Sequence, residues 1–294
     1  MTIQNGTRST VFKIVASAVA ALSLVAVAAP AGAAGGGAKH PRSGGFSFEG
    51  PFGTFDQAQL QRGYRVYREV CAACHGMDLM SFRNLGQPGG PFYDSHFKGG
   101  PADNPYVRVL AAEVQVADID SETGEPIMRP ATPADRFPNP YANATAAAGA
   151  NGGAAPPDLS VMAKARHDGA NYIYSLLSGY VPAPEGLQIA PGQYYNPYMP
   201  GDLTPFWTGD PDEVPSGGFI AMPNPLADGQ VTYDDGSPQT VDQYSKDVAA
   251  FIAWASDPHA TERKRTGMGV LAFLVIFAGL TYASYRRIWK GIAH

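Results

Sequence analysis

Apolar residues at helical spacing predict an α-helix that leads directly into a short cysteine motif. We expect the helix to begin at Thr54, because Gln57 follows three residues later in a capping-box pattern. Its apolar positions continue through Leu60 and Tyr67 to Cys71. The motif that starts at Cys71 is therefore expected at the carboxyl end of a helix that packs against the core.

Three more helices are predicted before the C-terminal region. Residues 159–166 and 169–178 are interpreted as two short helices. A longer amphipathic helix is expected from Thr240, where the capping pattern recurs, to Asp257, which is followed by proline. The chain holds 34 Gly and 26 Pro, and the long segments between these helices are expected to be mostly irregular.

The apolar stretch 267–285 contains no charged residue and is long enough to cross a membrane. Nineteen residues in a helix span roughly 28 Å, close to the ~30 Å hydrocarbon core of a bilayer. Six basic residues flank the stretch, three on each side: Arg263, Lys264, Arg265, Arg286, Arg287 and Lys290. This pattern predicts a membrane anchor over residues 263–294, but the equal numbers of cations leave its orientation open.

Residues 1–34 have the features of a cleaved signal peptide. Two basic residues precede an apolar run over 14–29, and small residues follow up to Ala33. A retained anchor is the alternative, but small residues suit cleavage after Ala33 or Ala34 better. Export would place residues 35–262 in the periplasm as a soluble domain, with a single-pass anchor in the inner membrane and a short cytoplasmic tail.

Charge is unevenly distributed along the chain. All 26 acidic residues lie within residues 35–262, together with 13 of the 21 basic residues, which gives this region a formal charge of −13. A negative charge of this size attracts a basic partner and accelerates its association with the protein. It is also compatible with an acidic surface that only keeps the domain soluble. Nucleic acid is excluded as a partner.

The sequence Cys71-Ala72-Ala73-Cys74-His75 matches the attachment motif of c-type haem. Two thiols one helical turn apart can add to the two vinyl groups of haem, and the adjacent histidine then lies beneath the iron. A thioredoxin-like site would require a βαβ context, and a zinc site would require further ligands, yet the chain has only two cysteines. The motif therefore predicts one covalently bound haem c with His75 as the proximal iron ligand.

Four residues are candidates for the second axial ligand. A methionine would raise the reduction potential, as an electron carrier requires. Met222 and Met199 both precede a proline, so spacing alone favours Met222 only slightly, and either could be core filler. His167 and, less plausibly, His96 complete the set.

Eight further blocks of sequence accompany the haem motif: Tyr67 to Val70 before it, Pro156 to Ser160, Ala165 to His167, Tyr172 to Tyr180, Tyr195 to Tyr198, Ala221 to Pro223, Asp234 to Gly236, and Trp254 to Ser256. In this order they resemble the cytochrome c1 family of bacterial type, the haem subunits of quinol–cytochrome c oxidoreductase (the bc1 complex). The resemblance covers nearly all of the chain after residue 34.

The resemblance implies roles for residues that spacing could not assign. Met222 matches the axial methionine of the family, and Arg166 matches a residue that pairs with a haem propionate. Tyr172, Pro157 and Asn151 match residues around the haem.

Two other features follow from the comparison with the family. Gly63 and Tyr67 resemble a pair at which the first helix crosses the last one, near Phe251 and Trp254. The extra disulfide of some bacterial members is absent, because both cysteines belong to the haem motif. The 201–217 segment looks longer than in mitochondrial relatives and carries four acidic residues.

We therefore expect a mostly α, class I cytochrome c-like haem domain with long loops and one C-terminal transmembrane helix. The resemblance implies an electron-transfer subunit of the respiratory chain without substrate chemistry of its own. Its implied partners are cytochrome b, the Rieske iron–sulfur protein as donor, and a soluble, basic cytochrome c as acceptor. The alternatives are a membrane-tethered c-type cytochrome of another complex and a haem peroxidase or ligand sensor.

Overall fold

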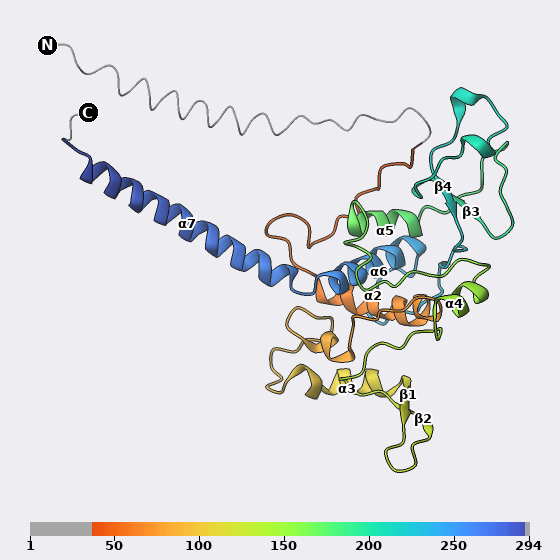
Figure 1. Ribbon diagram of the computed structural model, residues 1–294, viewed down its shortest axis with the longest axis horizontal. Coiled ribbons are helices and arrows are strands. Elements are labelled where there is room, and N and C mark those ends of the chain that lie inside the picture. The colour runs from red at the N-terminus through yellow and green to blue at the C-terminus, as the bar shows by residue number, and fades with distance from the viewer. Residues whose placement is uncertain (1–36, 292–294) are drawn as a thin grey trace. The chain divides into compact units, whose positions relative to one another are not determined.

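The computed structural model describes residues 37–291, and the predicted signal peptide lies outside this range. The described part is mostly helical, as expected, with two small antiparallel sheets (Figure 1). The helices are α2 (Gln57–Glu69), α3 (Pro105–Ala112), α4 (Ala144–Ala150), α5 (Gly169–Leu177), α6 (Val241–Ser256) and α7 (Ala260–Ile288). The strands are β1 (Gln115–Ile119), β2 (Pro126–Pro130), β3 (Tyr194–Asn196) and β4 (Gly218–Ile220).

The core forms where α2 crosses α6, with α5 packed on another side of α6 (Figure 1). Gly63 makes the close crossing possible: a Cβ atom there would lie 2.1 Å from the carbonyl oxygen of Asp247 and 2.7 Å from the Cβ of Phe251. Tyr67, one turn later, packs its ring 5.7 Å from that of Phe251. The crossing that the sequence resemblance implied is therefore confirmed.

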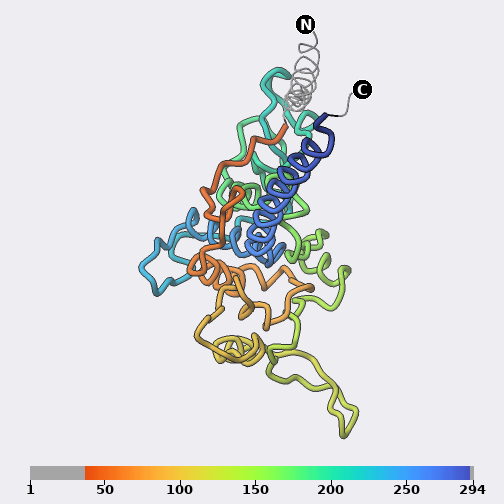
Figure 2. The backbone as a smooth tube through the Cα atoms, turned by 90° about the vertical axis from the view of Figure 1, so that its left-hand side faces the viewer, coloured from red at the N-terminus to blue at the C-terminus, as the bar shows by residue number. Residues whose placement is uncertain are grey.

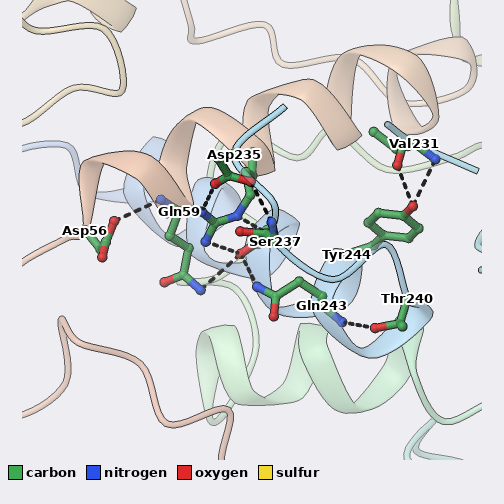
Figure 3. A network of polar contacts seen from close by, with 10 residues as sticks. Asp56, Gln59, Val231, Asp235, Ser237, Thr240, Gln243 and Tyr244 are labelled. Carbon is green, nitrogen blue, oxygen red and sulfur yellow. Dashed lines mark hydrogen bonds and ion pairs between the residues drawn. The ribbon is translucent and has the colours of Figure 1, made fainter. Parts of the chain in front are cut away.

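A buried ion pair lies at the same crossing. Asp247 on α6 is fully buried, and its carboxylate accepts a hydrogen bond from Arg62 on α2 at 2.9 Å. The amides of Gln59 and Gln243 also donate to it, and Arg62 reaches Asp235 at 2.7 Å (Figure 3). Burial opposes the charge on Arg62, but its bonds to the two carboxylates outweigh burial and raise its pKa. The network joins α2, α6 and the loop that precedes α6.

Tyr244 on α6 also binds the loop that precedes this helix, through Val231. Its hydroxyl donates to the carbonyl of Val231 at 2.5 Å and accepts from the amide of Val231 at 3.2 Å (Figure 3). Both residues are fully buried. Tyr244→Phe would leave a buried N–H and a buried C=O unpaired, so it should lower the free energy of unfolding by about 1–3 kcal/mol.

Denaturant unfolding of the detergent-purified protein, followed by circular dichroism, measures this loss. Tyr106→Phe is the control, because the Tyr106 side chain is 63% exposed. Equal stability of the two variants would contradict the role given to the Tyr244 hydroxyl.

Two of the helix predictions are corrected. Thr54 does not cap α2, because the helix begins only at Gln57; Asp56 is its N-cap and accepts from the amide of Gln59 at 2.9 Å. Residues 159–166 form turns rather than a helix. Their amides are partly bonded outside the segment, as in the bond from Ala163 to the Ser256 hydroxyl. The helices predicted over 169–178 and from Thr240 to Asp257 are confirmed as α5 and α6.

The acidic segment after α3 forms an antiparallel hairpin, in which β1 pairs with β2. Figure 2 shows it extending away from the helices. Apolar and polar residues alternate only weakly over residues 113–125, and the two strands bury almost none of their side chains. A local turn, in which Gly124 adopts a positive φ of 74°, therefore does more to define this hairpin than core packing does.

The predicted C-terminal membrane-spanning helix is confirmed as α7, which is 29 residues long and begins before the apolar stretch. Its large apolar side chains are exposed, as those of a lipid-facing helix must be. Two of the cations that precede the apolar stretch bind nearby polar groups. Lys264 donates to the carbonyl of Phe48 at 2.5 Å, and Arg263 pairs with Asp257.

Candidate haem site

The cysteine motif begins just beyond the end of α2. A single 3₁₀ turn over Cys71–Ala73 follows the helix, and the amides of Cys74 and His75 both bond to the carbonyl of Cys71, at 3.1 and 2.9 Å. Both cysteines are unpaired and half-buried. The turn therefore presents two thiols and an imidazole within one short segment, as attachment of one macrocycle requires.

The ring of His75 is held through one of its two nitrogens. Its Nδ1 lies 2.8 Å from the carbonyl oxygen of Pro157, which can only accept a hydrogen bond. The neutral ring therefore carries its proton on Nδ1 and leaves Nε2 as an electron-pair donor. Burial lowers the pKa of His75, and the opposing effects of Pro157 and Asp158 are smaller, so the ring is neutral at neutral pH.

The environment of Cys71 disfavours redox chemistry of the thioredoxin kind. Burial, with a smaller contribution from Cys74, raises the pKa of the Cys71 thiol to about 12. A thiol of that pKa is almost entirely protonated at neutral pH and is a weak nucleophile. No cluster of three or more metal-binding side chains occurs among residues 37–291, so a zinc site there is not supported either. The donor set of two thiols and one imidazole fits haem c.

The two candidate methionines have different surroundings. The sulfur of Met199 accepts a hydrogen bond from the Tyr172 hydroxyl at 3.6 Å. Met222 is half-buried against the core, and its carbonyl accepts from the Tyr180 hydroxyl at 2.9 Å. Within the described range no hydrogen bond reaches the Met222 sulfur, which leaves that atom available as a ligand.

The two candidate histidines are poor ligands in this arrangement. The side chains of His96 and His167 are 95% and 93% exposed, and each ring lies beside an aspartate, Asp94 and Asp168 respectively. An iron ligand in a haem protein is normally shielded from water, so neither site is suitable.

The remaining predicted haem contacts are distributed over three segments. Arg166 is exposed and lies near the Tyr172 hydroxyl, where it partly offsets the rise that burial causes in the pKa of Tyr172. Pro157 is in contact with His75 through its carbonyl. The side chain of Asn151 bonds back to Ala147 in α4, and no bond joins it to the cysteine motif.

Two further residues at the site were not assigned a role from the sequence. The Tyr141 hydroxyl lies 3.9 Å from the sulfur of Cys74, and Tyr180 bonds to Met222. Tyr180 belongs to a block that carries the family resemblance, but a one-dimensional pattern does not show which hydroxyl meets which carbonyl.

Comparison with known proteins gives a consistent result over nearly the whole described chain. The family model described as "Cytochrome C1 family" matches residues 46–292. The cytochrome c1 of Blastochloris viridis is 41% identical over 300 residues, which cover 95% of this chain and 96% of that protein. The cytochrome c1 of Rhodospirillum rubrum is 39% identical over 282 residues, covering 88% and 93%. A Bradyrhizobium diazoefficiens protein named "Cytochrome b/c1" is 43% identical over 272 residues, which cover 86% of this chain but only 36% of that longer protein.

Proposed function

This chain belongs to the cytochrome c1 family, the electron-transferring haem subunits of bc1 complexes, and on this premise we propose how its own residues serve the haem. Cys71 and Cys74 bind one haem c through thioether bonds, and the Nε2 of His75 and the sulfur of Met222 hold the iron. The observation that carries the proposal is the bond between His75 Nδ1 and the Pro157 carbonyl at 2.8 Å, because it fixes the tautomer in which Nε2 can bind iron.

The bound haem supplies a one-electron iron couple, and the protein's task is to hold and tune it. Arg166 is exposed and lies beside Tyr172. In this position its guanidinium could form a bidentate ion pair with a haem propionate. Tyr172 and Pro157 line the site with it. Asn151 is included on the family resemblance alone.

We place the chain between two mobile electron carriers. It takes electrons from the Rieske iron–sulfur protein and passes them to a soluble cytochrome c, while α7 packs beside cytochrome b. The fused name "Cytochrome b/c1" of one relative supports the last association. The charge distribution supports a basic acceptor, because the segment between Arg166 and Lys246 contains Met222 and ten acidic residues but no lysine or arginine.

The haem domain is proposed to lie on the periplasmic side of the inner membrane. One membrane-spanning helix at the C-terminus, α7, anchors it. The predicted signal peptide over 1–34 supplies the orientation, with residues 35–262 outside and the tail after α7 in the cytoplasm.

Purification of the full-length protein from its membranes in mild detergent tests this assignment. We expect a haem-stained band for this chain after denaturing electrophoresis, and co-migration with a b-type haem before denaturation. We also expect a quinol to reduce the c-type haem in the intact preparation. A c-type spectrum with no b-type haem and no reduction by quinol would instead favour a cytochrome of another complex.

A further inference from the structure

No disulfide constrains the loop that carries Met222. The loop begins where β4 ends at Ile220 and runs to the start of α6 at Val241. Both cysteines are in the haem motif, so no disulfide can close the loop. On the amino-terminal side, β4 is fixed by its antiparallel pairing with β3, in which Ile220 lies opposite Tyr194. Residue 222 itself lies beyond that sheet.

A single hydrogen bond holds Met222 at this point. The hydroxyl of Tyr180 donates to the Met222 carbonyl at 2.9 Å, and the structure shows no other hydrogen bond to Met222 within residues 37–291. Tyr180 is half-buried and lies three residues beyond the end of α5, so its backbone follows an element packed on α6. The neighbours Ala221 and Pro223 are both exposed and give the residue little packing of their own.

A second tyrosine, eight residues before Tyr180, contacts the other candidate methionine, Met199. Tyr172 in α5 donates its hydroxyl to the sulfur of Met199 at 3.6 Å. The two tyrosines therefore engage different atoms: Tyr172 occupies the sulfur of Met199, whereas Tyr180 holds the backbone of Met222 and leaves its sulfur unbonded. The two methionines, which both precede a proline, therefore differ in the atoms that these hydroxyls contact.

We propose that Tyr180 is a positioning residue that keeps the sulfur of Met222 directed at the haem iron. The inference rests on the proposed role of Met222 as axial ligand. The Tyr180 bond fixes the carbonyl of Met222 and thereby restricts rotation of the backbone from which the thioether extends. Without the bond, no hydrogen bond within residues 37–291 holds Met222 itself, because Tyr244 and Arg62 fix only the later part of the loop, and the sulfur leaves the iron more often.

Carbon monoxide binding to the reduced, haem-loaded, full-length protein measures how often the sulfur leaves. Tyr180→Phe removes only the hydroxyl, and we expect carbon monoxide to bind roughly two- to tenfold faster than to the unaltered protein, the factor that corresponds to one net hydrogen bond. The ferric protein should show a matching loss of the weak absorption band of iron–thioether coordination. Tyr174→Phe is the matched control, because Tyr174 lies in α5, just before Tyr180, and its hydroxyl donates to Asp242 at 2.6 Å and not to Met222.

Met222→Leu serves as the reference for a fully open iron. If Met222→Leu does not admit carbon monoxide, the ligand assignment in the proposed function fails, and this inference fails with it. If Met222→Leu opens the iron but Tyr180→Phe behaves as the unaltered protein does, only the role of Tyr180 is overturned. Equal acceleration in Tyr174→Phe would show general loosening of the domain and would also overturn it. Haem staining and melting temperature, unchanged in Tyr180→Phe, confirm that the variant is folded and loaded.

Discussion

Replacing Met222 with leucine should open the haem iron to carbon monoxide and lower its reduction potential. Leucine has a similar volume but no donor atom, so the loop keeps its packing while the iron loses a ligand. A thioether favours the reduced iron, and its loss should lower the potential by on the order of 100 mV, a fraction of the ~0.8 V range over which axial ligands set haem potentials. Redox titration and optical spectra of the purified protein, with and without carbon monoxide, measure both effects.

Met199→Leu is the control for this substitution. It removes a second half-buried methionine that also precedes a proline, but the sulfur of Met199 is already bonded to the Tyr172 hydroxyl. The variant should keep its potential and exclude carbon monoxide. The opposite result, in which Met199→Leu opens the iron and Met222→Leu leaves it closed, would transfer the axial role to Met199.

The sequence predicts well those features that depend only on residues close together in the chain. The haem motif depends on three side chains within five residues, and one 3₁₀ turn after α2 brings them together. The cap of α6 likewise needs only Thr240 and the amide of Gln243. The membrane helix requires only length and apolar composition, and α7 has both.

The features that sequence could not predict depend on partners far away in the chain. Met222 and Met199 both precede a proline, so local sequence hardly separates them without the family resemblance, whereas in the structure they differ in their contacts with Tyr180 and Tyr172. The helix predicted over 159–166 fails for a similar reason, because the amide of Ala163, which a helix would bond to the carbonyl of Leu159, bonds to the Ser256 hydroxyl instead. Helical periodicity shows which residues can share a face, but it does not show where competing hydrogen-bond partners lie.

Gly63→Ala should be among the most destabilising single substitutions in the haem domain. The new Cβ would meet the carbonyl oxygen of Asp247 at 2.1 Å, and its carbonyl carbon and the Cβ of Phe251 at 2.7 Å. These are backbone or first side-chain atoms that cannot swing aside, so α2 and α6 would have to separate. Separation also lengthens the bond between Arg62 and the fully buried Asp247.

Alanine is also a better helix former than glycine, and this gain in stability opposes the loss that the clash causes. In a helix interior alanine is favoured over glycine by ~1 kcal/mol, whereas overpacking costs ~1–3 kcal/mol. Because the clash is with backbone and weakens a buried ion pair, we expect a net loss of about 2 kcal/mol in the free energy of unfolding. Gly149→Ala in α4 is the matched control: nothing lies within 4 Å of its Cβ position, so the same substitution there should leave stability unchanged or raise it. Denaturant unfolding of both variants separates the two contributions, and a Gly63→Ala protein as stable as Gly149→Ala would show that the helices do not meet at residue 63.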